Sequence, residues 1–497
     1  MKKTGRKLQA ATLAAAIVLL FGACGRNPAV SDPASAQTTG VGTAQSTDAV
    51  QSTGETQDTA STGSTKGTGS ATANANKTTT KASATVKPTG SSGAQTDLSW
   101  SQVLAKMPAS LKGTTLKLVS WNTAKDVPNG EKVMADFTKA TNIQVEWETI
   151  AYDTYSTEIN ARVAAKNSPD IIRLKNLNLG LLSVMQPLSN AGYDFNDKAW
   201  SKMVMDFYSV NGKSYAANLE NTLFQQPKTL LYNQNLVSKY DLEDPYTLWK
   251  QKKWTYKKFL EICTTFKEET PSDYLPWTSM NWGDYPNMLG VGLVKYDGGK
   301  FVNNATDKKV LQGFQEMARL LETGITNNLS FDRTNFEAGK ILFFTESPIG
   351  ARRTHYYFQS LKANGSLRAV PMPAIEGQTY YQMMAELEAY GIPQGAANAK
   401  AVPYFLRYYL DAKNYDENTF FADKTILDVY KSCMKEKNIF MNYDSMVITE
   451  DVGIKAYSLY ATYVQQKPAQ IATFLSRDKT VIDNAVKQAN NKLARIK

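Results

Sequence analysis

Pairs of aromatic or polar side chains follow three short segments that are rich in strand-forming residues. These pairs are Trp121 and Asn122, Tyr152 and Asp153, and Lys175 and Asn176. An aromatic ring presents a flat apolar face, and amide, carboxylate and ammonium groups supply hydrogen bonds around it. Apolar walls with a few converging polar groups are typical of small-molecule sites. These residue types therefore favour a binding site.

A second candidate group, Trp282, Asp284 and Tyr285, follows Pro276 in a stretch punctuated by Pro, Gly and Asn. The stretch has neither helical nor strand periodicity, which indicates a loop that could offer a stacking surface. We expect Trp282 to contact a ligand ahead of Trp277. The sequence leaves open that these aromatic side chains pack in the core instead.

No recognisable catalytic or metal-binding set is present in the sequence. The chain has one histidine, His355, so a multi-histidine metal site is excluded, and we expect a structural role for this residue. There is no Gly-x-Ser-x-Gly motif and no nucleotide-binding fingerprint. The two catalytic carboxylates of a glycosidase have no fixed spacing in a sequence, so a secreted hydrolase stays a minor alternative. We expect no catalysis, no metal and no cofactor.

Two of the three cysteines, Cys263 and Cys433, lie in segments with helical apolar spacing. Neither belongs to a Cys-x-x-Cys or Cys/His pattern, so a zinc site has no support. Buried thiols are the favoured interpretation. A bridge between these two cysteines stays open, because the chain is expected to leave the cytoplasm.

The elements that must position the first three pairs alternate between strands and helices. We expect strands at 116–121, 143–147 and 170–172 and helices at 132–140 and 155–165. Ser168-Pro169 ends the second helix, because proline disrupts helical hydrogen bonding. This order predicts a mainly parallel sheet with helices on its faces. Ligands bind outside the carboxyl ends of such strands, where the three pairs stand.

The N-terminus predicts export and a lipid anchor. Lys2, Lys3, Arg6 and Lys7 precede an apolar run at 10–21 that is too short to span a bilayer, and Gly22-Ala23-Cys24 resembles a bacterial lipobox. Residues 25–97 are rich in Ser, Thr and Gly and should form a disordered tether. Residues 98–497 should fold into two lobes, since they exceed one usual core. The chain's formal charge is +10, with no Lys/Arg cluster typical of nucleic-acid binding.

Five segments occur in the order found in extracellular solute-binding proteins of ABC importers, of the sugar-binding type (family 1), and the chain resembles that family. They are Thr141-Asn142-Ile143-Gln144-Val145-Glu146, Ser168-Pro169-Asp170-Ile171, Leu231-Tyr232-Asn233-Gln234-Asn235-Leu236, Phe336-Glu337-Ala338-Gly339-Lys340-Ile341 and Gly391-Ile392-Pro393-Gln394-Gly395-Ala396. The stretch from Asp244 to Leu260 is similar to members from Gram-positive bacteria. The resemblance implies a two-lobed α/β fold of the periplasmic-binding-protein type (type II) that closes on a ligand.

The resemblance also implies where the lobes divide. We expect crossings near 217–221, 345–347 and 388–391, an N-terminal lobe of 113–219 and 347–388, and a C-terminal lobe of 220–346 and 389–497. Glu220, Asn221, Glu346 and Arg352 would then face the ligand, although a solvated face remains an alternative for the arginine. Glu386 and Glu388 could be hydroxyl acceptors or exposed charges.

The expected function is that of a monomeric, lipid-anchored receptor on the outer face of the cell membrane. It would bind a sugar or oligosaccharide and deliver it to the transmembrane subunits of an ABC permease. Two alternatives remain: a surface protein that adheres to glycans without transport, suggested by the long tether, and a binder of a non-sugar solute.

Overall fold

A computed structural model describes residues 96–175, 179–278, 289–326, 332–375, 383–435, 439–441, 443–444, 468–477 and 479–496. Contacts divide the chain into Met1–Lys87 and Pro88–Lys497, and every described residue lies in the second unit. Cys24, the leader and almost all of the expected tether lie outside the described residues. No helix in the described part has the length and apolar character that a bilayer crossing requires.

The first lobe is built on a five-stranded sheet with the order β2-β1-β3-β15-β6. Its strands are β1 (Thr115–Ser120), β2 (Gln144–Thr149), β3 (Ile171–Lys175), β6 (Ala216–Ala217) and β15 (Glu388–Gly391). β1 pairs in parallel with β2 and β3, whereas β15 is antiparallel to β3 and β6. The predicted crossover helices are present as α3 (Gly130–Thr141) and α4 (Tyr152–Ala164). The expected β-α-β-α-β order is therefore confirmed.

Helices cover this sheet with apolar stripes. Val133 and Phe137 of α3 and Ile159 of α4 are fully buried, at helical spacing within each element. The rings of Phe137 and Phe405 meet edge to face, which brings α14 (Val402–Tyr409) against α3. Short helix α2 (Trp100–Ala105) joins this layer through the contact of Trp100 with Tyr408.

The second lobe is built on a four-stranded sheet with the order β13-β8-β12-β9. Its strands are β8 (Thr229–Asn233), β9 (Leu275–Thr278), β12 (Ile341–Glu346) and β13 (Leu367–Pro371). All six residues of β12 are buried, as expected for a central strand covered on both faces. Gly339, with φ of +72°, makes the turn between α12 (Arg333–Glu337) and β12.

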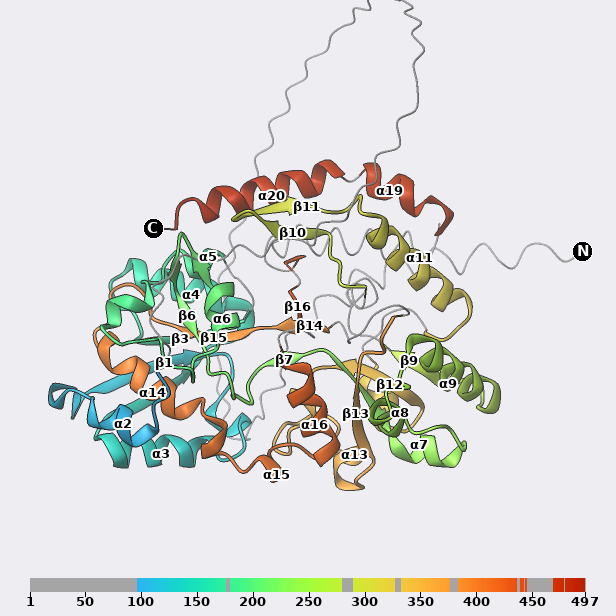
Figure 1. Cartoon of the computed structure of the whole chain (residues 1–497), viewed down its shortest axis with the longest axis horizontal. Coiled ribbons are helices and arrows are strands. Elements are labelled where there is room, and N and C mark those ends of the chain that lie inside the picture. The colour runs from blue at the N-terminus through green and yellow to red at the C-terminus, as the bar shows by residue number, and fades with distance from the viewer. Residues whose placement is uncertain are drawn as a thin grey trace, which may run out of the picture. The chain divides into compact units, whose positions relative to one another are not determined.

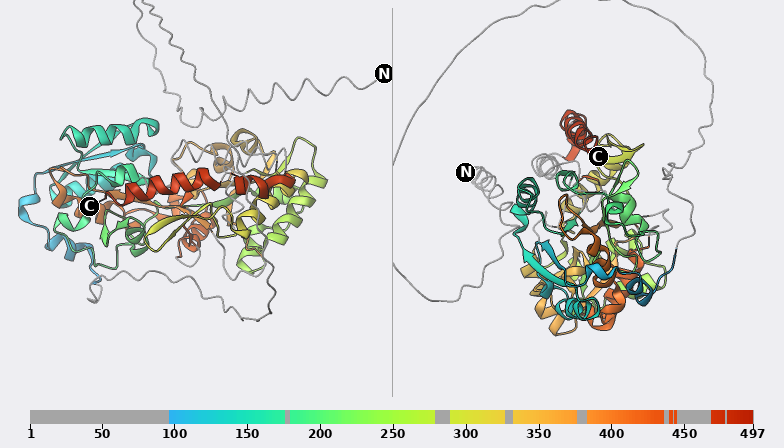
Figure 2. Two further views of the ribbon diagram at one scale, coloured as in Figure 1. Left: turned by 90° about the horizontal axis from the view of Figure 1, so that it is seen from above. Right: turned by 90° about the vertical axis from the view of Figure 1, so that its left-hand side faces the viewer.

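Further strands and helices belong to the described part of the chain. They are β4 (Ser209–Val210), β5 (Lys213–Ser214), β10 (Val294–Asp297), β11 (Lys300–Asn303), α5 (Leu179–Leu182), α6 (Lys202–Phe207), α7 (Gln234–Lys239), α8 (Pro245–Lys250), α9 (Tyr256–Glu269), α11 (Lys308–Glu322), α12 (Arg333–Glu337), α13 (Gln359–Ala363), α15 (Glu417–Phe420), α16 (Lys424–Cys433), α19 (Ile471–Arg477) and α20 (Lys479–Leu493). Figures 1 and 2 show α20 lying along β10 and β11.

Three connections join the lobes in the part of the chain that the structure describes, and Figure 1 shows β7, β14 and β16 between the two sheets. The first connection is 218–228 and contains β7 (Gln226–Pro227). The second is 372–387 and contains β14 (Met383–Glu386), which pairs with β7 and with β16 (Ile439–Phe440). The third is 410–423, between α14 and α16.

The strand pairing corrects the expected lobe boundaries. Leu367–Pro371 pairs with β8, so it belongs to the second sheet rather than to the first lobe. Residues after 388 were expected in the C-terminal lobe, but β15 pairs with β3 and α14 packs on α3. The chain consequently does not return to the first sheet near 345–347. It returns through the second connection, because β12 and β13 both use β8 as their partner.

Candidate binding site

Trp121 and Tyr152 meet at the carboxyl edge of the first sheet, and we call this pair the platform. Trp121 is the first residue after β1, and Tyr152 opens α4. Their ring centroids are 5.4 Å apart, with the planes at 81°. The Trp121 side chain is half-buried, whereas Tyr152 is 54% exposed. The platform therefore combines one fixed ring with one open to solvent.

Buried Tyr155 supports the platform from within the lobe. Its ring meets Trp121 edge to face, with centroids 5.1 Å apart. The Tyr155 hydroxyl lies 3.0 Å from the carbonyl oxygens of Val119 and Arg173 and accepts a hydrogen bond from the Arg173 amide at 3.1 Å. Burial raises the pKa of Tyr155 well above its ordinary value, so the phenol stays neutral. This anchored ring limits the movement of Trp121.

A cation lies against the Trp121 ring. The Arg173 guanidinium carbon is 4.5 Å from the ring centroid, and Nε donates to Glu388 Oε2 at 2.9 Å. The Arg173 and Glu388 side chains are 7% and 0% exposed, respectively. The sequence suggested that Glu388 is either an exposed charge or a hydroxyl acceptor, and the structure supports neither role. Glu388 is the buried partner of Arg173.

The other residues expected at this edge lie beside the platform. The Asn122 carbonyl accepts a hydrogen bond from Trp147 Nε1 at 2.6 Å. Asp153 is exposed in the first turn of α4, and Lys175, which ends β3, is half-buried. Asn176 lies outside the described residues. All three strand ends on which the expectation depended therefore meet at one edge.

In the second lobe, Glu346 is followed by a tyrosine-rich segment that reaches the first lobe. Glu346 ends β12, is 8% exposed, and accepts a hydrogen bond from the Ser347 amide at 2.6 Å. Thr354 Oγ1 donates to the Asp126 carbonyl at 3.4 Å, so the segment after β12 touches the loop that follows β1. Two residues on, Tyr356 is 58% exposed.

Sequence reasoning missed Tyr356, Tyr357 and Arg333. The Arg333 guanidinium lies 4.0 Å from the centroid of the Tyr357 ring, and the two tyrosine rings are 4.5 Å apart. The signal that could have found the tyrosines is their position in the segment that follows the buried strand β12.

Arg352 does not face this site and corrects our expectation. It is 3% exposed, its Nη2 donates to the Leu223 carbonyl at 3.0 Å, and its guanidinium lies 5.4 and 5.0 Å from the rings of Phe224 and Phe420. Burial lowers the pKa of Arg352 from its ordinary value. The residue fills the region where the first and third connections meet.

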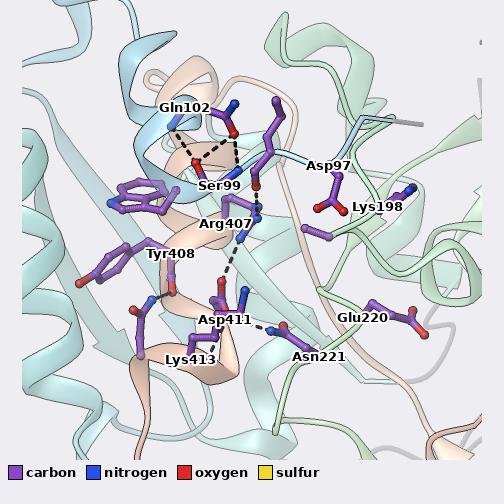
Figure 3. Close-up of a pocket in the computed structure, with 14 residues that line it drawn as sticks. Asp97, Ser99, Gln102, Lys198, Glu220, Asn221, Arg407, Tyr408, Asp411 and Lys413 are labelled. Carbon is purple, nitrogen blue, oxygen red and sulfur yellow. Dashed lines mark hydrogen bonds and ion pairs between the residues drawn. The ribbon is translucent and has the colours of Figure 1, made fainter. Parts of the chain in front are cut away.

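Glu220 and Asn221 line a different hollow, a cavity of about 480 Å³ between α2, α14 and the first connection. Figure 3 shows Arg407 and Asp411 at its centre. Asn221 Nδ2 donates to Asp411 Oδ1 at 2.8 Å, which links the first and third connections. Neither platform residue lines this cavity. The structure therefore separates Glu220 and Asn221 from the platform.

Several other expectations are resolved by burial. Trp277 is 1% exposed and donates from Nε1 to Thr345 Oγ1, so it belongs to the core. Cys263 and Cys433 are buried free thiols and form no bridge. His355 is buried, its Nδ1 accepts from the Tyr357 amide at 3.2 Å, and burial lowers its pKa to about 3. Trp282, Asp284 and Tyr285 lie outside the described residues.

The chain matches the family described as "Bacterial extracellular solute-binding protein" over residues 132–422. The diacetylchitobiose binding protein DasA of Streptomyces coelicolor is 23% identical over 185 residues, which are 35% of this chain and 40% of that relative. The matched stretch thus spans less than half of DasA.

Solved structures similar to this chain include sugar-binding proteins. The sugar-binding protein MalE from Xanthomonas citri has a TM-score of 0.57 at 16% identity and covers 75% of this chain and 98% of its own. The galacto-N-biose-/lacto-N-biose I-binding protein of an ABC transporter from Bifidobacterium longum has a TM-score of 0.56 at 14% identity, covering 76% and 98%. The predicted two-lobed α/β fold is confirmed.

Proposed function

Since this chain belongs to the family of bacterial extracellular solute-binding proteins, we propose that it captures a sugar or oligosaccharide outside the cell and delivers it to an ABC permease. A lipid on Cys24 would hold it at the outer face of the membrane, and residues 25–97 would let the binding domain move away from that surface. The expected reach of such a flexible tether is on the order of 40 to 50 Å.

The observation that carries this proposal is the platform at the carboxyl edge of the first sheet. A pyranose ring has an apolar face of C–H groups and a rim of hydroxyls. The Trp121 and Tyr152 rings, one half-buried and one 54% exposed, offer a surface for such a face. Asp153, next to Tyr152, and Lys175, at the end of β3, would then hydrogen-bond to the hydroxyl rim. The similar proteins MalE and the lacto-N-biose-binding protein have sugar ligands by name.

Closure of the lobes would complete the site. The Thr354 contact with Asp126 brings the segment with Tyr356 toward the loop after β1. A ligand held between Trp121 and Tyr356 would touch both lobes and stabilise the arrangement in which they approach. Binding that favours one arrangement is the only way a ligand can drive such a motion. The permease would then recognise the ligand-bound arrangement.

We expect the purified protein to be stabilised by one series in a panel of mono- to tetrasaccharides of glucose, galactose, xylose and N-acetylglucosamine. A ligand at 100 times its dissociation constant adds roughly 2.7 kcal/mol of stability, which a thermal-shift assay detects. Calorimetric titration of the best saccharide then tests the platform. Trp121→Ala and Tyr152→Ala should each weaken binding about tenfold or more, because a stacking ring is lost.

The matched control is Tyr296→Ala, which removes another partly exposed tyrosine, on β10. The dissociation constant of the Tyr296→Ala variant for the same saccharide should equal that of the unchanged protein. Stabilisation by an amino acid or peptide instead of a saccharide would refute the sugar assignment while keeping the receptor role. Retention by an insoluble glycan without binding of any short saccharide would favour adhesion over transport.

A further inference from the structure

Arg173 is an unusual residue for its position. It stands third in β3, between Ile172 and Leu174, both of which are buried. Burying a guanidinium removes it from water and is costly unless it is paired and hydrogen-bonded. A strand buried to this extent is ordinarily aliphatic throughout. The pairing that offsets this cost therefore points to a role for the residue.

The edge and the plane of the Arg173 guanidinium group contact different neighbours. Its edge makes a forked pair with Glu388, through Nε and Nη2, and its plane lies against the Trp121 ring at 4.5 Å. The forked geometry fixes the orientation of a guanidinium, which a lysine ammonium cannot reproduce. An orientation fixed in this way also fixes the surface on which Trp121 rests.

Glu388 in turn binds the first connection. Its carboxylate accepts a hydrogen bond from Gln226 Nε2, and its amide donates to Gln225 Oε1 at 2.8 Å. Its carbonyl accepts from Gln225 Nε2 at 2.9 Å and from Asn218 Nδ2 at 2.8 Å. Glu388 also follows the second connection directly. One residue therefore ties together two of the three segments that join the lobes.

We propose that Arg173 is a positioning residue, which holds the Trp121 ring for the ligand and links it through Glu388 to the first and second connections. This inference depends on the proposed function, because it assumes that Trp121 contacts the ligand. A bound sugar ring that displaced Trp121 would also have to displace the Arg173 guanidinium. That group cannot reorient without breaking its ion pair with Glu388. Ligand contact and lobe arrangement are thereby coupled through Trp121, Arg173 and Glu388.

The test compares two buried arginines of the first lobe. Arg173→Lys keeps the charge but loses the forked pair and the flat contact. Arg407→Lys makes the same change at a residue that is 6% exposed and paired with Asp197 and Asp411, without contact to Trp121. With the saccharide that stabilises the unchanged protein most, Arg173→Lys should weaken binding about tenfold, and Arg407→Lys should leave it unchanged.

A double-mutant cycle separates positioning from general destabilisation. In the Trp121→Ala background, Arg173→Lys should cause little further loss, because its effect on affinity passes through that ring. Additive losses, or equal losses for Arg173→Lys and Arg407→Lys, would overturn the inference. Should Arg173→Lys fail to fold, Glu388→Gln loosens the same pair while keeping its shape, and it should weaken binding in the same direction.

A ligand-free measurement keeps the inference separate from the proposed function. Quenching of tryptophan emission by acrylamide should increase in Arg173→Lys and not in Arg407→Lys. The increase should vanish when Trp121→Phe removes the reporting indole. If no saccharide binds, the proposed function fails, while this measurement still decides whether Arg173 holds Trp121. No change in quenching would refute the positioning role.

Discussion

At the scale of single residues, His355 is the only histidine in the chain and is buried. Burial lowers its pKa to about 3 from 6.5, and the charges of Arg352, Lys362 and Arg333 act in the same direction. In the unfolded chain the imidazole takes up a proton near pH 6.5, whereas in the folded protein it remains neutral. The unfolded state therefore binds more protons between pH 6.5 and about 3, and stability falls as the pH falls through that window.

We predict that His355 alone lowers the free energy of unfolding by about 2 kcal/mol between pH 7.5 and pH 5. His355→Asn keeps an acceptor near the Tyr357 amide and removes the titration. Urea unfolding of both proteins at the two pH values measures the effect as a difference of differences. Because no other histidine is present, the rest of the pH dependence of stability in this range comes from carboxylates. These are the same in both proteins, so their contribution cancels. Identical pH dependence in the two proteins would contradict the assignment.

Residue-scale reasoning from sequence worked where a side chain follows its ordinary preference. The burial of Cys263 and Cys433 was predicted, and a core position for Trp277 was one of two alternatives, because apolar side chains avoid water. The burial of Arg352 and Glu388 could not. Burying a charged side chain is costly unless a partner offsets its desolvation, and Arg173, the partner of Glu388, lies 215 positions away in the sequence.

At the scale of elements, α8 begins with a cap that also supports the second sheet. The Asp244 carboxylate accepts from the Thr247 amide at 2.9 Å, and its other oxygen accepts from the Tyr232 hydroxyl at 2.7 Å. Tyr232 belongs to β8 and is fully buried. The same aspartate thus satisfies a helix end and a phenol in the core.

Asp244→Ala should destabilise the protein by about 2 to 3 kcal/mol, the sum of a lost cap and a buried hydroxyl left without its acceptor. Asp307→Ala is the matched control, because Asp307 caps α11 through the Lys309 amide at an exposed site. That change should cost about 1 kcal/mol. Chemical denaturation compares the two variants. Equal losses would show that the Tyr232 contact adds nothing.

At this scale the sequence predicted the order of strands and helices along the first part of the chain, but not which strands pair in the second lobe. The strands and helices of the first β-α-β-α-β stretch could be predicted, since crossovers place successive strands in one parallel sheet. Leu367–Pro371 has no such constraint: its pairing with β8 rather than with the first sheet depends on antiparallel contacts that periodicity does not encode. The platform was predictable for the same reason as the first sheet, whereas Tyr356 depended on how the second lobe meets it.

At the scale of the whole domain, α20 joins parts of both lobes. Asn490 makes two hydrogen bonds of 2.9 Å with the Phe301 backbone on β11, and Asn303 donates to Asp483 at 2.8 Å. α20 also contacts α5, and just beyond the C-terminal end of the helix the Ile496 carbonyl accepts a hydrogen bond from Asn211 Nδ2 at 3.3 Å. β11 lies between β9 and α11 in the chain, whereas α5 and Asn211 belong to the first lobe. The helix is therefore a further link between the lobes, separate from the three connections.

Ending the chain at Leu493 should loosen the lobes without unfolding either of them. The truncation removes Ile496, which is 3% exposed, and the contact with Asn211, while the bonds of Asn490 to β11 remain. In small-angle scattering the ligand-free truncated protein should have a larger radius of gyration than the unchanged one, because one restraint on lobe separation is gone. Asn490→Ala, which removes the two hydrogen bonds to Phe301, should leave the first-lobe contact in place and loosen β10 and β11 instead. If truncation leaves the radius unchanged, the lobes are held by their three connections alone, and α20 serves only to cover β10 and β11.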